Sequence, residues 1–246
     1  MINDVIYLAY LLEGAAAVCG FYYFKKKPDD RANFYFACFL LLTYIVESLG
    51  WLPYIFYLHE DLNYLREGLW HQNFWFFNPY LILSYAFYAN YFRTKLSRPR
   101  FRKILKTLIF AFILTAVLNL IFSDVLMLSL SAYTTMAGTF LILLSIIGYY
   151  DEILRSEKIL YVSKDISFYF SVALLIFHLM ITPFYIYFRY FKLSVSPAFV
   201  ELYSLVNAYS NIFLYSWFGV VFLYFSGSLK LLPNRKQVET FKELDR

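Results

Sequence analysis

The 246-residue sequence has few charged residues and few glycines. Charged residues make up 16% of the chain, below the roughly 25% that is usual in soluble domains, whereas apolar residues make up 61%. Eight glycines are present, about half the usual share of roughly 7%. The composition excludes a disordered chain and disfavours a soluble globular domain. The shortage of glycine also disfavours carriers built from interrupted helices, which use glycine and proline at their breaks.

Motifs that would name a reaction are missing as well. The chain contains no H-E-x-x-H or C-x-x-C pattern for a metal and no G-x-S-x-G pattern for a serine nucleophile. A retinal protein needs a buried lysine in its last span, and residues 199–226 contain none. We therefore expect a protein that is not an enzyme, with no cofactor and no metal site.

Long apolar runs, broken by clusters of charge, are the main positive signal. A helix needs about 20 apolar residues to cross the roughly 30 Å hydrocarbon core of a bilayer. The sequence predicts an all-α, polytopic integral membrane protein with seven transmembrane helices, at residues 2–24, 32–58, 69–92, 104–122, 125–150, 166–190 and 199–226. Residues 1–228 form one domain in this prediction, and residues 229–246 form a short charged tail.

Basic residues are distributed very unequally between the two sides of these spans. Of the 22 lysines and arginines, 19 lie in the first, third and fifth loops and the tail, and three lie on the opposite side. Because basic residues near span ends are retained in the cytoplasm, we expect the N-terminus outside and the C-terminus in the cytoplasm, in the cell inner membrane. The loop residues Arg98, Arg100, Arg102 and Lys103 are expected to contact lipid headgroups or a cytoplasmic partner. Nucleic acid is not expected as a partner.

Three ionisable residues lie deep inside the predicted spans. Glu13, Glu47 and His178 each lie about 11 or 12 residues from the outer ends, roughly 17 Å below the outer surface. Asn78, Thr135 and Asn211 lie at a similar depth. Because charge in hydrocarbon is costly, these six residues are our candidates for a ligand or proton site, with Glu47 or Glu13 paired to His178. The alternative is that each polar group only bonds a neighbouring helix.

Other residues suggest how such a site would open and flex. His71 and Asn73 lie at the outer end of the third span and are candidates for the mouth of the pocket. Pro53 and Pro183 are expected to kink the second and sixth spans near the polar layer. Aromatic residues make up 23% of the chain, and they either fill the core or line an apolar pocket.

These features favour a non-enzymatic membrane sensor that binds a small or lipophilic ligand and signals through a separate cytoplasmic protein. In outline the plan is similar to the seven-helix input halves of some bacterial sensor kinases, but we expect no output domain after the last predicted span. A small-solute or proton-coupled transporter with a 3+1+3 helix plan is the alternative. The 134-residue offset that relates residues 34–36 to 168–170 gives only seven identities in 62 positions, against roughly five by chance. A structural subunit of a membrane complex is the third possibility.

Overall fold

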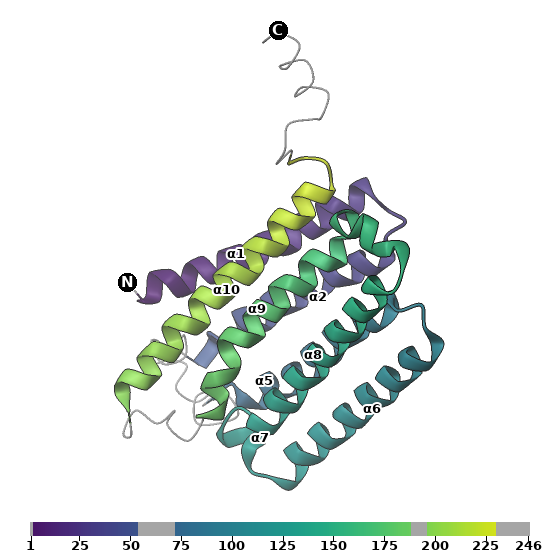
Figure 1. The fold of residues 1–246 in the computed structure, drawn as a ribbon. Helices are drawn as coiled ribbons and strands as arrows, with labels where there is room; N and C mark the ends of the chain where they lie inside the picture. Colours follow the sequence, from purple (N-terminus) through teal and green to yellow (C-terminus); the bar gives the residue numbers. More distant parts are fainter. Residues whose placement is uncertain (1, 54–71, 188–195, 230–246) are drawn as a thin grey trace.

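The computed structural model describes residues 2–53, 72–187 and 196–229, and in them every regular element is a helix. The two short elements are α7 (Val125–Leu128) and the 3-10 helix η3 (Glu157–Lys164). The long helices lie side by side as one bundle, with α6 at one edge and α1 beside α10 at the other (Figure 1). Their bounds are Ile2–Lys26 (α1), Arg31–Leu49 (α2), Phe74–Lys95 (α5), Pro99–Phe122 (α6), Ala132–Leu154 (α8), Ile166–Ile186 (α9) and Pro197–Phe225 (α10).

Six of the described helices are long and apolar enough to cross a membrane: α1, α2, α6, α8, α9 and α10. Large apolar side chains, such as Leu11, Phe110 and Phe140, point outward along these helices and are 69–70% exposed. A soluble monomer rarely leaves so much apolar surface uncovered. The structure therefore indicates a multi-pass membrane protein, in agreement with the sequence.

The third predicted span corresponds to α5, which differs in character from the other long helices. Its 22 residues extend about 33 Å, the thickness of a hydrocarbon core. It is nevertheless absent from the six apolar helices. Arg93 and Lys95 lie in its last turn, and Tyr80, Ser84 and Tyr88 give one side a polar character. This helix has the length of a span but not the hydropathy of one.

The second predicted span ends earlier than expected. α2 ends at Leu49 instead of residue 58, and the Gly50 N–H makes the last helical contact with Val46 O at 3.1 Å. Pro53 has no N–H, and in a continued helix its ring would collide with the carbonyl of Leu49, four residues earlier. Pro53 therefore lies beyond α2, and the predicted kink of the second span at this residue stays a prediction. Residues 54–71, which contain the rest of this span, lie outside the described residues.

The connection between the fourth and fifth predicted spans is longer than the expected two-residue turn. α6 ends at Phe122, as predicted, although it begins at Pro99, because proline suits the first turn of a helix. The short helix α7 then intervenes, and α8 begins at Ala132 instead of residue 125. Ser131 fixes this start, since its side chain accepts a hydrogen bond from the Thr134 N–H at 3.1 Å.

One end of the bundle carries the basic helix ends, and we call it the basic end, defined by Lys26, Arg31 and Lys95. The opposite end, called the cavity end, contains Leu49 and Phe74. Because successive helices alternate in direction, α1, α5, α8 and α10 run toward the basic end, whereas α2, α6 and α9 run away from it (Figure 1).

Buried polar contacts hold the helices together at the basic end. The Tyr91 hydroxyl on α5 donates to Oδ1 of Asn33 on α2 at 2.7 Å and lies 3.0 Å from Oγ of Ser167 on α9. Asn33 in turn donates to Asp30 Oδ2 at 2.6 Å, and Tyr23 on α1 donates to the same oxygen at 2.8 Å. Four helices are thus joined through one network, which fixes their spacing at this end.

Phenylalanines fill the space next to this network. Phe36 stacks on Phe170 with ring centroids 4.4 Å apart and meets the edge of Phe218 at 5.1 Å. Phe222 completes the cluster at 5.0 Å from Phe170, and all four rings are fully buried. For these residues the packing interpretation of the aromatic content is therefore correct, because no space is left between the rings for a ligand.

Close packing of α8 against α5 depends on Gly138. A Cβ atom at this position would overlap the ring of Tyr85, which is itself buried. We expect Gly138→Ala to lower the free energy of unfolding by about 1–2 kcal/mol, because overpacking outweighs the better helix propensity of alanine. The matched control is Gly219→Ala, where the new Cβ would lie 3.8 Å from Ala16 Cα, an ordinary contact. Thermal unfolding in detergent measures both, and equal melting temperatures would contradict the argument.

Candidate functional site

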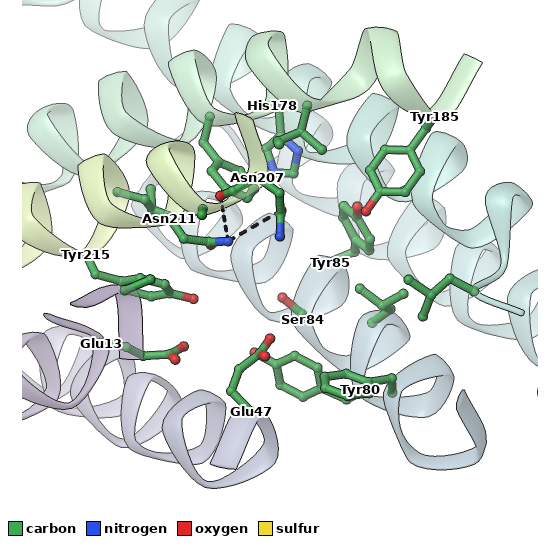
Figure 2. A pocket seen from close by; sticks show the side chains of 18 of the residues that line it. Glu13, Glu47, Tyr80, Ser84, Tyr85, His178, Tyr185, Asn207, Asn211 and Tyr215 are labelled. Atoms are coloured by element: carbon green, nitrogen blue, oxygen red, sulfur yellow. Dashed lines mark hydrogen bonds between the residues drawn. The ribbon is translucent and has the colours of Figure 1, made fainter. Parts of the chain in front are cut away.

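A cavity of about 440 Å³ lies among α1, α2, α5, α9 and α10, on the side of the phenylalanine cluster that faces the cavity end. Figure 2 shows its polar side chains converging from these helices on a common space. The described polar residues that line it are Tyr10, Glu13, Glu47, Asn73, Tyr80, Ser84, Tyr85, Tyr88, His178, Tyr185, Tyr203, Ser204, Asn207, Asn211 and Tyr215.

Two carboxylates face this space from different helices. Glu13 is on α1 and Glu47 is in the last turn of α2, and Figure 2 shows both carboxyl groups directed into the same space. Glu13 is only 2% exposed, and its Oε1 has no hydrogen-bond partner among the described residues. The hydroxyl of Tyr215, on α10, approaches the Glu13 carboxyl from the side (Figure 2). A buried acceptor without a partner is costly, so it marks a position for a donor or a cation.

His178 reaches the same cavity from α9. Its Nδ1 lies 3.4 Å from Oγ1 of Thr139 on α8, and its ring centroid lies 5.7 Å from that of Tyr85. His178, Glu13 and Glu47, which the sequence analysis placed at one depth, all line this cavity. In the described part of the chain, however, neither a hydrogen bond nor an ion pair joins the histidine to a glutamate, so the predicted pairing is not formed in this structure.

α10 presents a polar stripe to the cavity. Asn211, a predicted site residue, lines the cavity and donates from Nδ2 to the backbone oxygen of Asn207 at 3.0 Å. Tyr203, Asn207, Asn211 and Tyr215 follow one another every four residues and so share one helix face. Sequence reasoning identified only Asn211, although this spacing was a signal for the other three.

The facing side of α5 shows the same periodicity. Tyr80, Ser84 and Tyr88 are four residues apart and all line the cavity. The Tyr80 hydroxyl donates to Oγ1 of Thr43 on α2 at 2.7 Å, which fixes the ring beside Glu47 (Figure 2). These three residues were also missed, because tyrosine was counted as part of the apolar aromatic content.

Two predicted site residues lie elsewhere. Asn78 is fully buried, but its side chain binds the backbone of the turn between α6 and α8, at Ser129 O (2.9 Å) and Ser131 N (2.9 Å). Thr135 donates to Ser131 O at 3.1 Å within α8. Neither is among the described residues that line the cavity, and both side chains bond backbone groups instead.

The predicted mouth residues have different outcomes. Asn73 lines the cavity and donates from Nδ2 to Gly50 O at 3.2 Å, which ties the start of α5 to the end of α2. His71 lies outside the described residues. Pro183 lies inside α9, as predicted, between the cavity residues His178 and Tyr185.

The predicted surface contacts lie at the basic end, far from the cavity along the helices. Arg98 precedes α6, and its guanidinium donates to Asp151 Oδ2 at 2.7 Å, an exposed ion pair within the chain. Arg100, Arg102 and Lys103 are exposed on the first turns of α6. These three side chains are therefore the ones available to headgroups or to a partner.

The side chains of the cavity suit an organic molecule better than a metal ion. Within the described ranges, no group of three or more histidine, cysteine or acidic side chains is placed to hold a metal.

Comparison of the chain with protein-family models, with curated proteins and with solved structures finds no match. The chemistry of the cavity is therefore the main guide to function.

Proposed function

We propose that the protein is a non-enzymatic, receptor-like membrane sensor that binds a small or lipophilic ligand in the cavity and signals through a separate cytoplasmic partner. The cavity supports this proposal, because about 440 Å³ falls within the range of roughly 300–1,000 Å³ of small-molecule sites. Its aromatic walls and few convergent polar groups are the usual composition of such sites.

The proposal includes seven spans, with α5 as the third, and an N-out, C-in orientation in the cell inner membrane. Support comes from the 19 basic residues of the 22 that the sequence places in the loops and tail on one side. In this orientation the cavity lies in the outer half of the bilayer, and the exposed Arg100, Arg102 and Lys103 face the cytoplasm. Anionic lipid headgroups or an acidic partner surface would complement them.

Signal transfer would use α9. His178 and Tyr185 on this helix line the cavity, and Pro183 between them leaves one backbone carbonyl without its helical donor. A ligand that binds one position of α9 more tightly than another would shift the population of the two positions. The other end of α9, at Ile166, adjoins the basic end, where a partner would sense the shift.

A transporter that uses the same cavity is the second candidate. The buried, unpartnered Oε1 of Glu13 favours it, because carboxyl groups inside membrane bundles often carry protons or contact substrates. Uptake into vesicles that follows a pH gradient and disappears in Glu47→Gln would support this candidate. A structural subunit remains the third reading, and it predicts no ligand at all.

The test is whether a small molecule is retained in the cavity. The tagged protein, purified from its native membranes in mild detergent, is expected to release a stoichiometric compound that mass spectrometry identifies. Glu47→Gln and His178→Ala should retain at least about tenfold less of it, because both residues line the cavity. The control Glu201→Gln, exposed on α10, should retain as much as the wild type.

Two results would contradict the proposal. If the folded wild-type protein releases no compound, or if both cavity variants retain it normally, the cavity is not a ligand site. Crosslinking before purification tests the signalling half, which predicts a stoichiometric cytoplasmic protein bound at the basic end. A protein that emerges alone, together with proton-linked uptake, would instead favour the transporter.

A further inference from the structure

The charge of the cavity is one-sided. Glu13 and Glu47 line it, whereas none of the described lining residues is a lysine or an arginine. Glu47 also lies in the last turn of α2, where the helix dipole adds partial negative charge. Two carboxylates that share a low-dielectric space without a cationic side chain repel each other, and this cost is relieved when a positive charge enters.

A second observation, independent of the charge count, points to a missing partner. Glu13 is 2% exposed, its side chain is directed into the cavity, and its Oε1 accepts no hydrogen bond in the described part of the protein (Figure 2). Leaving a buried charged acceptor unsatisfied costs more than leaving a neutral one unsatisfied. A positively charged N–H donor, or a quaternary nitrogen in contact with the carboxylate, balances its negative charge and offsets the cost of removing it from water.

The walls around the carboxylates are aromatic. Tyr80 lies beside Glu47 and Tyr215 beside Glu13, and Tyr10, Tyr85 and Tyr88 line the same space (Figure 2). Aromatic faces attract cations and tolerate the apolar substituents of an organic cation, especially where water is excluded. The amide oxygens of Asn207 and Asn211 offer further acceptors. The cavity thus combines negative charge, aromatic faces and acceptors on different sides.

We propose that the cavity binds an organic cation, with its positively charged nitrogen between Glu13 and Glu47 and its apolar part against the tyrosine rings. This inference rests on the proposed ligand-binding function and names the class of ligand. A volume of about 440 Å³ accommodates an amine or quaternary ammonium compound with substituents. A bare metal ion fits less well, because the described residues provide no cluster of three metal-ligating side chains.

The experiment compares charged and neutral probes on the full chain in lipid nanodiscs. Isothermal titration calorimetry is run with choline, tetraethylammonium and benzyltrimethylammonium, and with 3,3-dimethyl-1-butanol, the neutral carbon analogue of choline. At least one cation is expected to bind, and choline is expected to bind at least about tenfold more tightly than its neutral analogue. Glu13→Gln and Glu47→Gln keep the side-chain shape and should each weaken cation binding at least about tenfold.

Glu201→Gln removes the same charge from an exposed position on α10 and should leave cation binding unchanged. If the neutral analogue binds as tightly as choline, or if the two cavity variants bind cations like the wild type, the cation inference is wrong. Failure of all three cations to bind the folded protein also overturns it. The proposed ligand-binding function survives these results if the native protein still releases a neutral or anionic compound that depends on Glu47 and His178.

Discussion

Replacing Asn78 with leucine is expected to lower the free energy of unfolding by about 3–5 kcal/mol. Asn78 is fully buried on α5, and its Nδ2 donates to Val125 O (3.2 Å) and Ser129 O (2.9 Å). Its Oδ1 accepts from the Ser131 N–H at 2.9 Å. Leucine fills a similar volume but removes the Asn78 partner of Ser129 O and of the Ser131 N–H, at about 1–3 kcal/mol each before relaxation, whereas Val125 O still accepts from the Ser129 N–H. An apparent melting temperature lowered by about 10 °C in detergent is the expected readout.

The matched control is Asn90→Leu, on the same helix but exposed, where the side-chain oxygen accepts a hydrogen bond from Arg93 Nε at 2.9 Å. It should unfold at the wild-type temperature. Binding of a ligand to folded Asn78→Leu should be normal, because Asn78 does not line the cavity. A variant with unchanged stability and lost binding would restore Asn78 to the site and contradict its structural role.

This outcome for Asn78 shows what the depth of a polar residue does and does not predict. Four of the residues selected by their depth along the chain, Glu13, Glu47, His178 and Asn211, line one cavity. Depth carries no information on which side of a helix faces the cavity. On α5 the cavity face contains Tyr80, Ser84 and Tyr88, and Asn78 lies on a neighbouring face that packs against the α7 turn. The direction of a side chain depends on the packing partners of the helix, which one sequence does not contain.

The four-residue spacing of polar side chains contained information on the cavity that the hydropathy pattern did not show. The four-residue spacing of Tyr203, Asn207, Asn211 and Tyr215 marks one face of α10, and it can be read from the sequence. Tyrosine counts as apolar in a composition sum, yet its hydroxyl makes it a polar wall when it faces a cavity. On α5, four tyrosines together with Ser84, Asn78 and Asn90 lower the mean hydropathy and keep this helix out of the six strongly apolar helices.

Helix existence was more predictable than helix ends. The charged residues 25–31 and 93–103 separate α1 from α2 and α5 from α6, as the apolar runs predict, because charge is costly inside an apolar span. The ends at Leu49 and Ala132 were not foreseen, because they depend on local backbone chemistry. Pro53 stops α2 through the carbonyl four residues earlier, and Ser131 starts α8 through its cap. Apolar residues continue past both boundaries, so hydropathy alone extends the helices too far.

The second large effect on stability is expected at Glu152, whose carboxylate on α8 caps the start of α6. Glu152, near the end of α8, is 6% exposed, and its oxygens accept from the Ser97 N–H at 2.7 and 2.8 Å and the Arg98 N–H at 3.3 Å. These N–H groups precede α6, whose N-terminal dipole also favours a negative charge. We expect Glu152→Ala to lower the free energy of unfolding by about 2–3 kcal/mol, because the charge-assisted bonds between the buried carboxylate and the start of α6 are lost.

Asp151→Ala is the matched control, because Asp151 is the adjacent acidic residue and its ion pairs with Arg98 and Arg155 are exposed. Exposed pairs contribute little, so its melting temperature should stay close to that of the wild type. Glu152→Gln keeps one acceptor oxygen and should fall between the wild type and Glu152→Ala. Equal losses for Asp151→Ala and Glu152→Ala would mean that negative charge, and not the cap on the Ser97 and Arg98 N–H groups, joins α8 to the start of α6. Because this contact lies at the basic end, ligand binding by the folded fraction should be the same in all three variants.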